Sequence, residues 1–484
     1  MTLTHSVLVQ VKPQFKWNEG LLIKLGAYED LPSLALPGKD VGDMRLLLSN
    51  CDDQPSQVLM SLGAREKITS DILRRAGGLL IKWMEKNHVA VAGLEYAGVS
   101  SLPIPEKLAF NAFIEGVFLG AFQFTKHKSA KTERPLLTID WLLDEAQIDQ
   151  TDALIEIIGK AKNLTGAVNL ARSWAHEPPN IINPITLAQR LGQLASKEGL
   201  SFSVLDDRQL AEMGANAILS VGKGSHTPSR LIVLEYAGQD PSAKPVVLVG
   251  KAITFDTGGY STKDPQGMVG MKYDKSGGMA VIAAVIAAAR LGIKTPVVGI
   301  IAAAENMISG EAYRPNDILL TLAGKTVEVI SADAEGRLVL CDALTYAQQK
   351  FQPRVLIDLA TLTGGVVVAL GKLRAGILGN DQALIHSLIQ SGERTHERLW
   401  QLPLDDEYFE LIKGDDSDFK NSGAREAHAT IGGIFLKQFV ANEIPWAHLD
   451  IAGVADTDKE QPYCQKGATG FGVRLLIDYL ENLE

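Results

Sequence analysis

The chain is poor in cysteine and in long apolar runs, and both shortages limit what it can be. Among its 484 residues there are three cysteines, Cys51, Cys341 and Cys464, at wide spacing. A disulfide framework or a cysteine metal site needs paired or clustered cysteines, so we expect reduced thiols, as in a cytoplasmic protein. No stretch of about 20 apolar residues is free of charge, and no membrane span is therefore expected.

Other common signals are missing as well. The segment MTLTHSVLVQVKPQFKW has no basic start followed by an apolar stretch and a cleavage site, so it is typical of a first strand and not of a signal peptide. The nine histidines are scattered and form no HExxH motif, which argues against a histidine zinc site. The formal net charge of −10 argues against a polyanion such as DNA as a partner.

The length and the order of the predicted elements indicate two α/β domains. A chain of 484 residues exceeds one ordinary core. Strand-like and helix-like runs alternate over residues 1–145, and they include an amphipathic helix predicted at 70–86. One long helix over 146–176 ends before Pro178-Pro179, where a helix cannot easily continue. We therefore predict a smaller N-terminal domain (1–145), a linker helix (146–178) and a larger C-terminal catalytic domain (179–484).

In the C-terminal part, strands and helices alternate more strongly. Several strand-like runs, such as 245–250, 295–304 and 354–360, are continuously apolar, as expected for a sheet that is covered on both faces. Helices are predicted between them, at 276–292 and 338–351, and a further strand of the same sheet is predicted at 326–330. This alternation predicts a mostly parallel, doubly wound sheet, whose ligands bind beyond the carboxyl ends of the strands.

Chemically active side chains concentrate between residues 251 and 337. Four acids, two lysines and one arginine fall there at predicted strand ends or helix starts: Asp256, Asp274, Asp333, Glu335, Lys251, Lys263 and Arg337. Four carboxylates brought together repel one another unless cations neutralise them. The pattern therefore indicates a site for two metal ions, and so a hydrolase. Oxygen ligands suit Mg²⁺ or Mn²⁺, and carboxylates also bind Zn²⁺.

Taken singly, these residues have simpler explanations. Asp274 alone would be best explained as a helix N-cap beside Ser276, and Asp256 alone as an Asx turn before Gly258. A lysine ligates a metal only as a neutral amine, which requires a strongly lowered pKa; otherwise it stays charged and stabilises negative charge. The grouping of all four acids at strand ends favours a metal site over these local roles.

The motifs around these residues resemble those of the leucyl aminopeptidases, the M17 family of dinuclear-metal exopeptidases. The segment SADAEGRL (331–338) is similar to the family's NTDAEGRL, and VGKAITFDTGGYSTK (249–263) is similar to VGKGxTFDSGGxSxK. ENMISGEAYRPND, DLATLTGG, DFKNSG, WAHLDIAG and KGATGFGVR also match. The similarity is continuous over the C-terminal domain and weaker before it.

The resemblance implies a role for each matching residue. Asp256 and Glu335 would bridge the two metal ions, and the full set of implied metal ligands is Lys251, Asp256, Asp274, Asp333 and Glu335. Lys263 would polarise the scissile carbonyl. Arg337 would hold a bicarbonate beside the main chain at Leu362. The implied substrate pocket consists of Met271, Ser331, Thr361 and Gly364.

The resemblance also implies an activity and an assembly. The activity is removal of the N-terminal residue, leucine and other mainly apolar residues, from short peptides by a metal-activated water. The cofactors are two divalent ions per subunit, Zn²⁺ or Mn²⁺ with Mg²⁺ and Co²⁺ as alternatives, and bicarbonate as general base. The implied assembly is a cytoplasmic homohexamer. The rival hypotheses are a DNA-binding regulator or scaffold, as some family members are, and another two-metal hydrolase such as a phosphatase.

A few positions depart from the family's motifs. Ser331-Ala332 stands where the family has Asn-Thr, and Ala252 replaces the usual Gly beside a metal lysine. Lys275-Ser276 replaces a more usual Met-Cys or Met-Gly. The smaller Ser331 is expected to alter the side-chain preference. Lys275 would weaken metal binding if it pointed inward, and we expect it to point outward.

Overall fold

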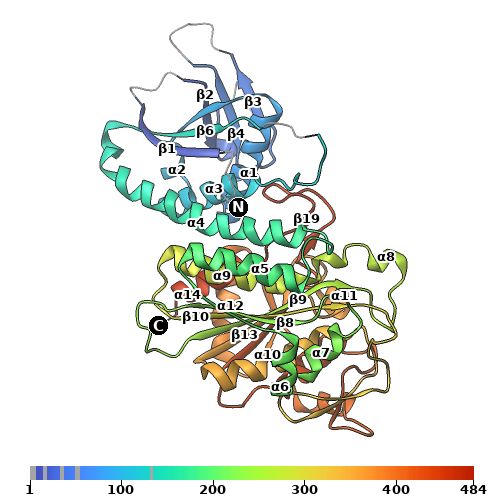
Figure 1. Cartoon of the computed structure of the whole chain (residues 1–484). Coiled ribbons are helices and arrows are strands. Elements are labelled where there is room, and N and C mark those ends of the chain that lie inside the picture. Colours follow the sequence, from blue (N-terminus) through green and yellow to red (C-terminus); the bar gives the residue numbers. More distant parts are fainter. Residues whose placement is uncertain (1–6, 15–18, 33–36, 49–54, 131–133, 484) are drawn as a thin grey trace. The chain divides into compact units, whose positions relative to one another are not determined.

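The computed structural model describes residues 7–14, 19–32, 37–48, 55–130 and 134–483 (Figure 1). The chain forms two compact units: unit 1 contains Met1–Asn169 and Asp458–Lys466, and unit 2 contains Leu170–Thr457 and Gly467–Glu484. Each unit is built on a mostly parallel sheet, so the predicted α/β class is confirmed. Cys341 and Cys464 are buried free thiols, and Cys51 lies outside the described residues.

Unit 1 is built around a six-stranded sheet of order β1-β6-β5-β2-β4-β3, parallel except for β3. Its strands are β1 (Val7–Pro13), β2 (Leu21–Gly26), β3 (Met44–Leu47), β4 (Gln57–Ser61), β5 (Val91–Glu95) and β6 (Leu137–Leu143). Its helices include α1 (Ser70–Lys86), α2 (Ala97–Ser100) and α3 (Glu106–Gly120). The predicted helix at 70–86 is confirmed as α1. Trp141 stands at the centre of the core, edge-on to Phe110 and Phe113.

The predicted long helix over 146–176 is present as two successive helices. A 3-10 helix covers Glu145–Gln150, and α4 follows over Thr151–His176. The division between the two units falls inside α4, between Asn169 and Leu170. The segment Asp458–Lys466 returns to unit 1, which the sequence did not indicate. The predicted domain limits stay a prediction.

Unit 2 contains an eight-stranded sheet of order β15-β14-β17-β13-β9-β10-β8-β7. Its strands are β7 (Ser201–Leu205), β8 (Arg230–Tyr236), β9 (Val246–Asp256), β10 (Val297–Asn306), β13 (Val355–Ala360), β14 (Ala375–Gly379), β15 (Leu399–Gln401) and β17 (Trp446–Asp450). The central four, β17, β13, β9 and β10, run parallel, as the continuous apolar runs predicted. They are almost wholly buried, because helices cover the sheet.

The helices of unit 2 connect these strands. They are α5 (Pro184–Glu198), α6 (Asp207–Met213), α7 (Asn216–Gly222), α8 (Pro265–Met268), α9 (Ser276–Leu291), α10 (Glu335–Phe351), α11 (Gly364–Leu370), α12 (Gln382–Thr395), α13 (His428–Lys437) and α14 (Val473–Glu481). Small sheets join β11 (Ile318–Leu320), β12 (Thr326–Glu328) and β16 (Phe419–Lys420), and β18 (Asp456–Thr457) with β19 (Gly467–Ala468). No helix within the described ranges is long and apolar enough to cross a membrane.

Two strand assignments from the sequence were wrong in detail. The strand predicted at 245–250 continues as β9 through Lys251 to Asp256. A charged residue suggests a strand end, but Lys251 is only 3% exposed and is neutralised inside the protein, so the strand continues. The strand predicted at 326–330 is β12, which belongs to a small sheet and not to the central one.

Helix α9 lies unusually close to the sheet. A Cβ atom on Gly250 of β9 would lie 2.6 Å from the Cα of Gly278, and one on Gly277 would collide with the main-chain oxygen of Leu359 in β13. Real Cβ contacts are never so short, so glycine is required at these positions for the helix to approach.

We expect Gly277→Ala to destabilise the protein by about 1–3 kcal/mol, because the new methyl group must push α9 away from β13. For a unit of this size that corresponds to a fall in the thermal midpoint of about 2–8 °C, measurable by calorimetry. The control is Gly310→Ala, where a Cβ would meet nothing within 4 Å. An unchanged midpoint for Gly277→Ala would contradict the tight packing.

Candidate metal centre

The central parallel strands of unit 2 all end at one edge of the sheet, and polar residues stand there. Strand β9 ends at Asp256, β10 at Asn306 and β17 at Asp450. The register pairs Asp256 with Asn306 and Ala360 with Asp450. These polar residues therefore stand at the carboxyl ends of the parallel strands, where sheets of this kind bind their ligands.

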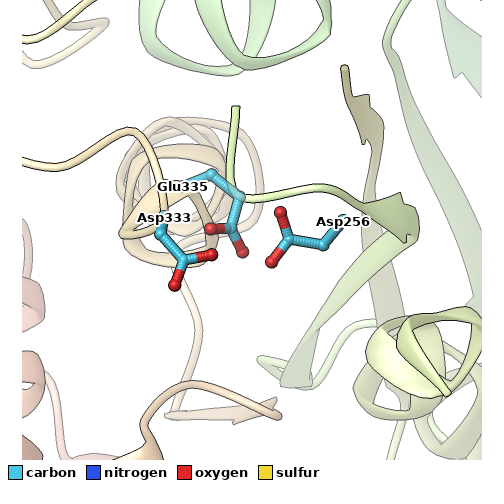
Figure 2. Close-up of side chains that lie close together, drawn as sticks. All are labelled: Asp256, Asp333 and Glu335. Carbon is cyan, nitrogen blue, oxygen red and sulfur yellow. The ribbon is translucent and has the colours of Figure 1, made fainter. Parts of the chain in front are cut away.

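Three carboxylates converge at this edge. Asp256, Asp333 and Glu335 point toward one another (Figure 2), and each offers an oxygen within 4.8 Å of the other two. Asp333 lies just before α10 and is exposed, whereas Glu335 is the first residue of that helix and is buried. The short connection between Asp333 and Glu335 thus places one acid toward solvent and the other in the protein interior.

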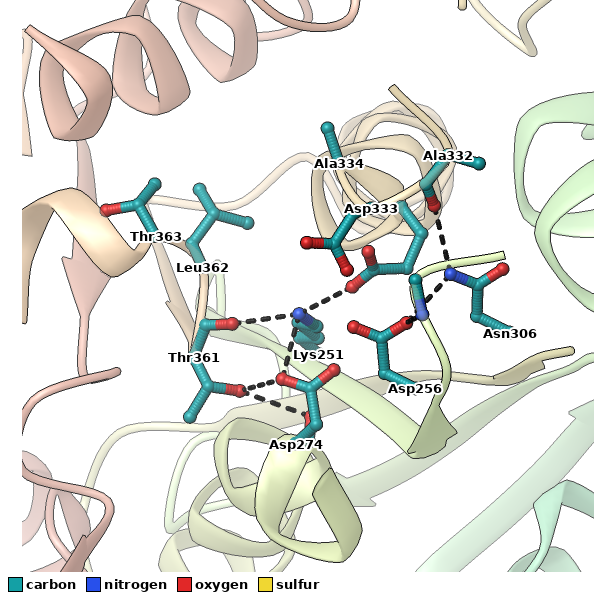
Figure 3. A network of polar contacts seen from close by, with 12 residues as sticks. Lys251, Asp256, Asp274, Asn306, Ala332, Asp333, Ala334, Thr361, Leu362 and Thr363 are labelled. Carbon is teal, nitrogen blue, oxygen red and sulfur yellow. Dashed lines mark hydrogen bonds and ion pairs between the residues drawn. The ribbon is translucent and has the colours of Figure 1, made fainter. Parts of the chain in front are cut away.

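The fourth acid, Asp274, joins the cluster through a buried lysine (Figure 3). Asp274 belongs to the 3-10 helix Met271–Lys275, which leads into α9. The Nζ atom of Lys251 lies 2.9 Å from Asp274 Oδ1 and 2.8 Å from Glu335 Oε1. It also donates to the main-chain oxygen of Thr361 at 2.8 Å. Lys251 therefore connects two of the acids to the loop that follows β13.

Lys263 neutralises the other side of the cluster. Its Nζ atom lies 2.9 Å from Asp256 Oδ2 and also contacts Asp333 Oδ1. Burial alone would lower the pKa of each lysine, but the carboxylates outweigh burial and raise it; Asp274 contributes most for Lys251 and Asp256 for Lys263. Without a metal ion, both lysines are ammonium groups.

The buried acids hold protons more tightly than usual. Burial, and then the charge of Asp256, raises the pKa of Glu335 to about 8. Burial raises the pKa of Asp274 to about 6 against the effect of Lys251, and burial with Asp256 raises that of Asp333. The two lysines therefore compensate the carboxylates only in part, and further positive charge would be stabilised here.

Unpaired oxygen atoms in the cluster fit a metal ion. Within the described chain, Asp274 Oδ2 and Glu335 Oε2 are buried without a hydrogen-bond partner. Buried polar atoms are nearly always paired, and each exception needs an explanation. Carboxylate oxygens that face other carboxylates suit a divalent cation, so these residues are a suitable donor set.

Of the two local roles considered for single acids, the Asx turn of Asp256 is present and the N-cap of Asp274 is not. Asp256 does form an Asx turn, because its Oδ1 accepts from the main-chain N–H of Gly258 at 2.8 Å, but its Oδ2 faces Lys263. Asp274 does not cap α9, which has no side-chain cap. Its Oδ1 accepts from the hydroxyl of Thr361 at 2.6 Å instead.

Arg337 and Leu362 are neighbours at one side of the cluster. A Cβ on Gly432 would lie 3.0 Å from Leu362 Cδ2 and 3.7 Å from Arg337 Nη2, so both side chains pack against that glycine. Arg337 is 1% exposed, and its Nη1 donates to the main-chain oxygen of Asn421 at 2.9 Å. Its Nε is buried without a partner in the described part of the chain. Burial lowers the pKa of Arg337 to about 10, so the group stays charged near neutral pH and can hold an anion.

The predicted pocket residues stand on the same segments. Met271 begins the 3-10 helix that carries Asp274, and Ser331 lies two residues before Asp333, whose N–H donates to its hydroxyl at 3.2 Å. Thr361 contacts Lys251 and Asp274, as described above. Gly364 begins α11, immediately after the Thr361–Thr363 loop.

Several supporting residues were not identified from the sequence. The side-chain amide of Asn306 donates to Asp256 Oδ1 at 2.8 Å and to the main-chain oxygen of Ala332 at 2.9 Å. The hydroxyl of Tyr313 donates to the same oxygen at 2.7 Å. Together they fix the peptide that precedes Asp333.

Two further buried residues fix the loops. Asn421 accepts from the main-chain N–H groups of Ile330 and Ser331 and donates to the oxygen of Ser331. Asp450, which is 0% exposed, accepts from the N–H groups of Leu362, Thr363 and Ala452 and from the hydroxyl of Thr363. Asn306 and Asp450 both end apolar strands, and that signal could have identified them.

The expectation for Lys275 was wrong. Its side chain does not point outward but is fully buried, and its Nζ donates to the main-chain oxygens of Glu177, at 3.0 Å, and Lys272. These carbonyl groups replace water around the charge. Burial, and then the charge of Lys272, lowers the pKa of Lys275 to about 7.

Both the N-terminal and the C-terminal part of the chain are similar to one family of known proteins. Residues 169–477 match the cytosol aminopeptidase family, catalytic domain, and residues 46–131 match the N-terminal domain of the same family. A probable cytosol aminopeptidase of Geobacter sp. (strain M21) is 44% identical over 425 residues, covering 87% of this chain and 85% of the relative. A probable cytosol aminopeptidase of Roseiflexus castenholzii (strain DSM 13941 / HLO8) is 41% identical over 471 residues, covering 95% of this chain and 96% of the relative. A solved structure of the bottromycin maturation enzyme BotP in complex with Mn is similar at a TM-score of 0.87 and 29% identity, covering 96% of this chain and 99% of BotP.

We expect Mn²⁺ affinity to rise as the pH is raised from about 6 to about 8, because the ion must displace protons from Asp274 and Glu335. Each displaced proton adds roughly tenfold in affinity per pH unit below its pKa. Calorimetric titration in buffers of different ionisation enthalpy counts the protons released. Glu335→Gln should bind more weakly and release fewer protons, whereas Glu311→Gln, an exposed control, should match the native protein. An affinity that does not change between pH 6 and 8 would contradict the assignment.

Proposed function

The chain belongs to the cytosol aminopeptidase family, and from this membership and the geometry of the acidic cluster we propose how its residues act in catalysis. The protein is a metal-dependent aminopeptidase, a hydrolase. The observation that carries the proposal is the convergence of four acids and two lysines at the carboxyl ends of the central strands. The ligands of two divalent ions would be Lys251, Asp256, Asp274, Asp333 and Glu335, with Asp256 and Glu335 bridging.

When bound, two divalent ions supply an acidified water, a polarised carbonyl and a ligand for the free α-amine of the peptide. Lys251 is placed to hold Asp274 and Glu335 in position without metal and would have to release its proton to become a ligand itself. We propose Mn²⁺ or Zn²⁺, with Mg²⁺ and Co²⁺ as alternatives; the manganese complex of the similar BotP supports Mn²⁺.

Lys263 is proposed to stabilise the negative charge that develops on the scissile carbonyl oxygen. It is partly exposed, keeps its proton because of the neighbouring carboxylates, and lies between Asp256 and Asp333. A charged donor that is already in place when the oxyanion forms lowers the barrier without reorganisation.

Arg337 and the main chain at Leu362 are proposed to hold a bicarbonate, which supplies the general base for the attacking water. The unpaired Nε of Arg337 supports this role, because it leaves a buried donor available to an anion. Hydrogen bonds to Asp450 hold the Thr361–Thr363 loop in place, and this would fix the position of the proposed anion site relative to the acidic cluster.

The proposed substrates are short peptides with leucine or another mainly apolar residue at the N-terminus. Met271, Ser331, Thr361 and Gly364 would line the pocket for that residue, and Ser331, smaller than the family's asparagine, would tune its preference. The proposed assembly is a homohexamer and the proposed location is the cytoplasm. The family match supports the assembly, and the names of the relatives, cytosol aminopeptidases, support the location.

The rival functions are not favoured. The family match and the cluster point to catalysis and not to a DNA-binding regulator. The ligand set consists of acids and a lysine, as in an aminopeptidase site, which also leaves little reason to propose a phosphatase.

The test is hydrolysis of leucyl p-nitroanilide by the metal-free protein with added Mn²⁺ or Zn²⁺. We expect activity that a chelator abolishes and fresh metal restores. A phosphomonoester and a DNA gel shift at moderate salt serve as parallel assays. Absence of anilide hydrolysis with either ion, or a faster reaction with the phosphomonoester, would refute the proposed function.

Lys263→Met should lower kcat by on the order of 10²-fold or more, as expected for loss of a charged donor to the oxyanion. The control is Lys244→Met, an exposed lysine just before the start of β9 and therefore at the opposite end of that strand from Asp256, which should keep native kcat. Steady-state kinetics on the anilide, with bound metal measured in each variant, separates lost catalysis from lost metal. A fully metal-loaded Lys263→Met enzyme with native kcat would exclude the proposed role.

A further inference from the structure

Unit 2 contains a cavity of about 920 Å³ next to the catalytic cluster. Residues between 364 and 369, residues between 423 and 430, and Leu402 line it. Gly364, which lines the cavity, follows the Thr361–Thr363 loop directly. The cavity therefore begins where the loop that contacts Lys251 and Asp274 ends.

The distance from the cluster suits a short peptide. Thr361 and Gly364 are three residues apart, so their Cα atoms are separated by at most about 11 Å. An extended peptide advances about 3.4 Å per residue. Since Gly364 also borders the pocket proposed for the N-terminal residue, the second to fourth residues of a substrate would extend along the cavity beyond it.

The cavity is lined mainly by small residues and carries one positive charge, that of Arg425. Seven of the twelve lining residues are glycine or alanine, so the walls expose main chain and leave room for varied side chains. Arg425 is exposed and lines the cavity, and it makes no ion pair with any residue in the described ranges. Its neighbour Glu426 is not part of the lining.

His428, the other titratable group of the lining, does not add a second charge near neutral pH. Burial, and then the positive charge of Arg337, lowers the pKa of His428. The imidazole is therefore neutral and can donate or accept a hydrogen bond. Arg425 is left as the cation of the cavity, with nothing in the described structure to neutralise it.

We propose that this cavity holds the C-terminal part of tripeptide and tetrapeptide substrates and that Arg425 pairs with their free terminal carboxylate. The inference rests on the proposed aminopeptidase function and names its substrate class: short peptides with an unblocked C-terminus. A guanidinium group matches a carboxylate through two parallel hydrogen bonds, a geometry that a blocked, uncharged C-terminus cannot reproduce.

The experiment compares Leu-Gly-Gly with its C-terminal amide on the metal-loaded enzyme. The native enzyme should prefer the free acid by about 2- to 5-fold in kcat/KM, the range of one ion pair at an exposed site. Arg425→Gln should lower kcat/KM for the acid to the level of the amide, through KM with kcat unchanged. Arg425→Lys, which keeps the charge, should retain part of the preference.

Two controls separate this effect from others. Arg208→Gln removes an exposed arginine elsewhere in unit 2 and should behave as native. Leucyl p-nitroanilide has no third residue, so every variant should hydrolyse it at the native rate. Failure of the native enzyme on the anilide would refute the proposed function, and the inference with it.

Three results would overturn the inference while the proposed function stands. One is a native enzyme that does not distinguish acid from amide. Another is Arg425→Gln with an undiminished preference for the acid. The third is an equal fall in kcat/KM for the acid and the amide in Arg425→Gln, together with a change in the molar mass of that variant in light scattering. This result would mean that the cavity faces a second copy of the chain.

Discussion

The repulsion among four carboxylates, three of them buried, is the constraint on which the catalytic unit depends. Two lysines offset it: Lys251 contacts Asp274 and Glu335, and Lys263 contacts Asp256 and Asp333. The compensation is incomplete, because burial and the charge of Asp256 still raise the pKa of Glu335 to about 8. Divalent cations would therefore be stabilised here, and their binding would release protons from the site.

Holding such a cluster together requires that the loops carrying its residues cannot move apart. Hydrogen bonds from buried polar side chains fix these loops. Asn306 connects Asp256 to the carbonyl before Asp333, and Asp450 accepts four hydrogen bonds, three of them from the Thr361–Thr363 loop. Asp450 uses both carboxylate oxygens and Asn306 uses its side-chain amide nitrogen for two bonds, whereas Asn306 Oδ1 is buried without a partner in the described part of the chain. The same loop leads directly to Gly364, which lines the cavity of Arg425.

Much of the fold and of the site was predictable, because the signals are local. Continuous apolar runs identified the parallel strands, and acids after those runs identified the edge where the site lies. The misjudged residues were charged ones. Lys251 was taken to follow its strand but lies inside it, and Lys275 was expected outside but is buried against the carbonyls of Glu177 and Lys272. In both cases the partners that make burial tolerable come from elsewhere in the chain.

The sequence by itself determined the order of strands and helices, the residue types at the strand ends and, through motif resemblance, the family. Only the tertiary structure decided which atoms meet. Lys251 and Thr361 are 110 residues apart, and Asn421 holds the loop of Ser331 across 90 residues. The physical reason is that a strand's neighbours are chosen by sheet order and register, which bring remote segments together. Whether a charge can be buried then depends on the donors and acceptors that those segments present.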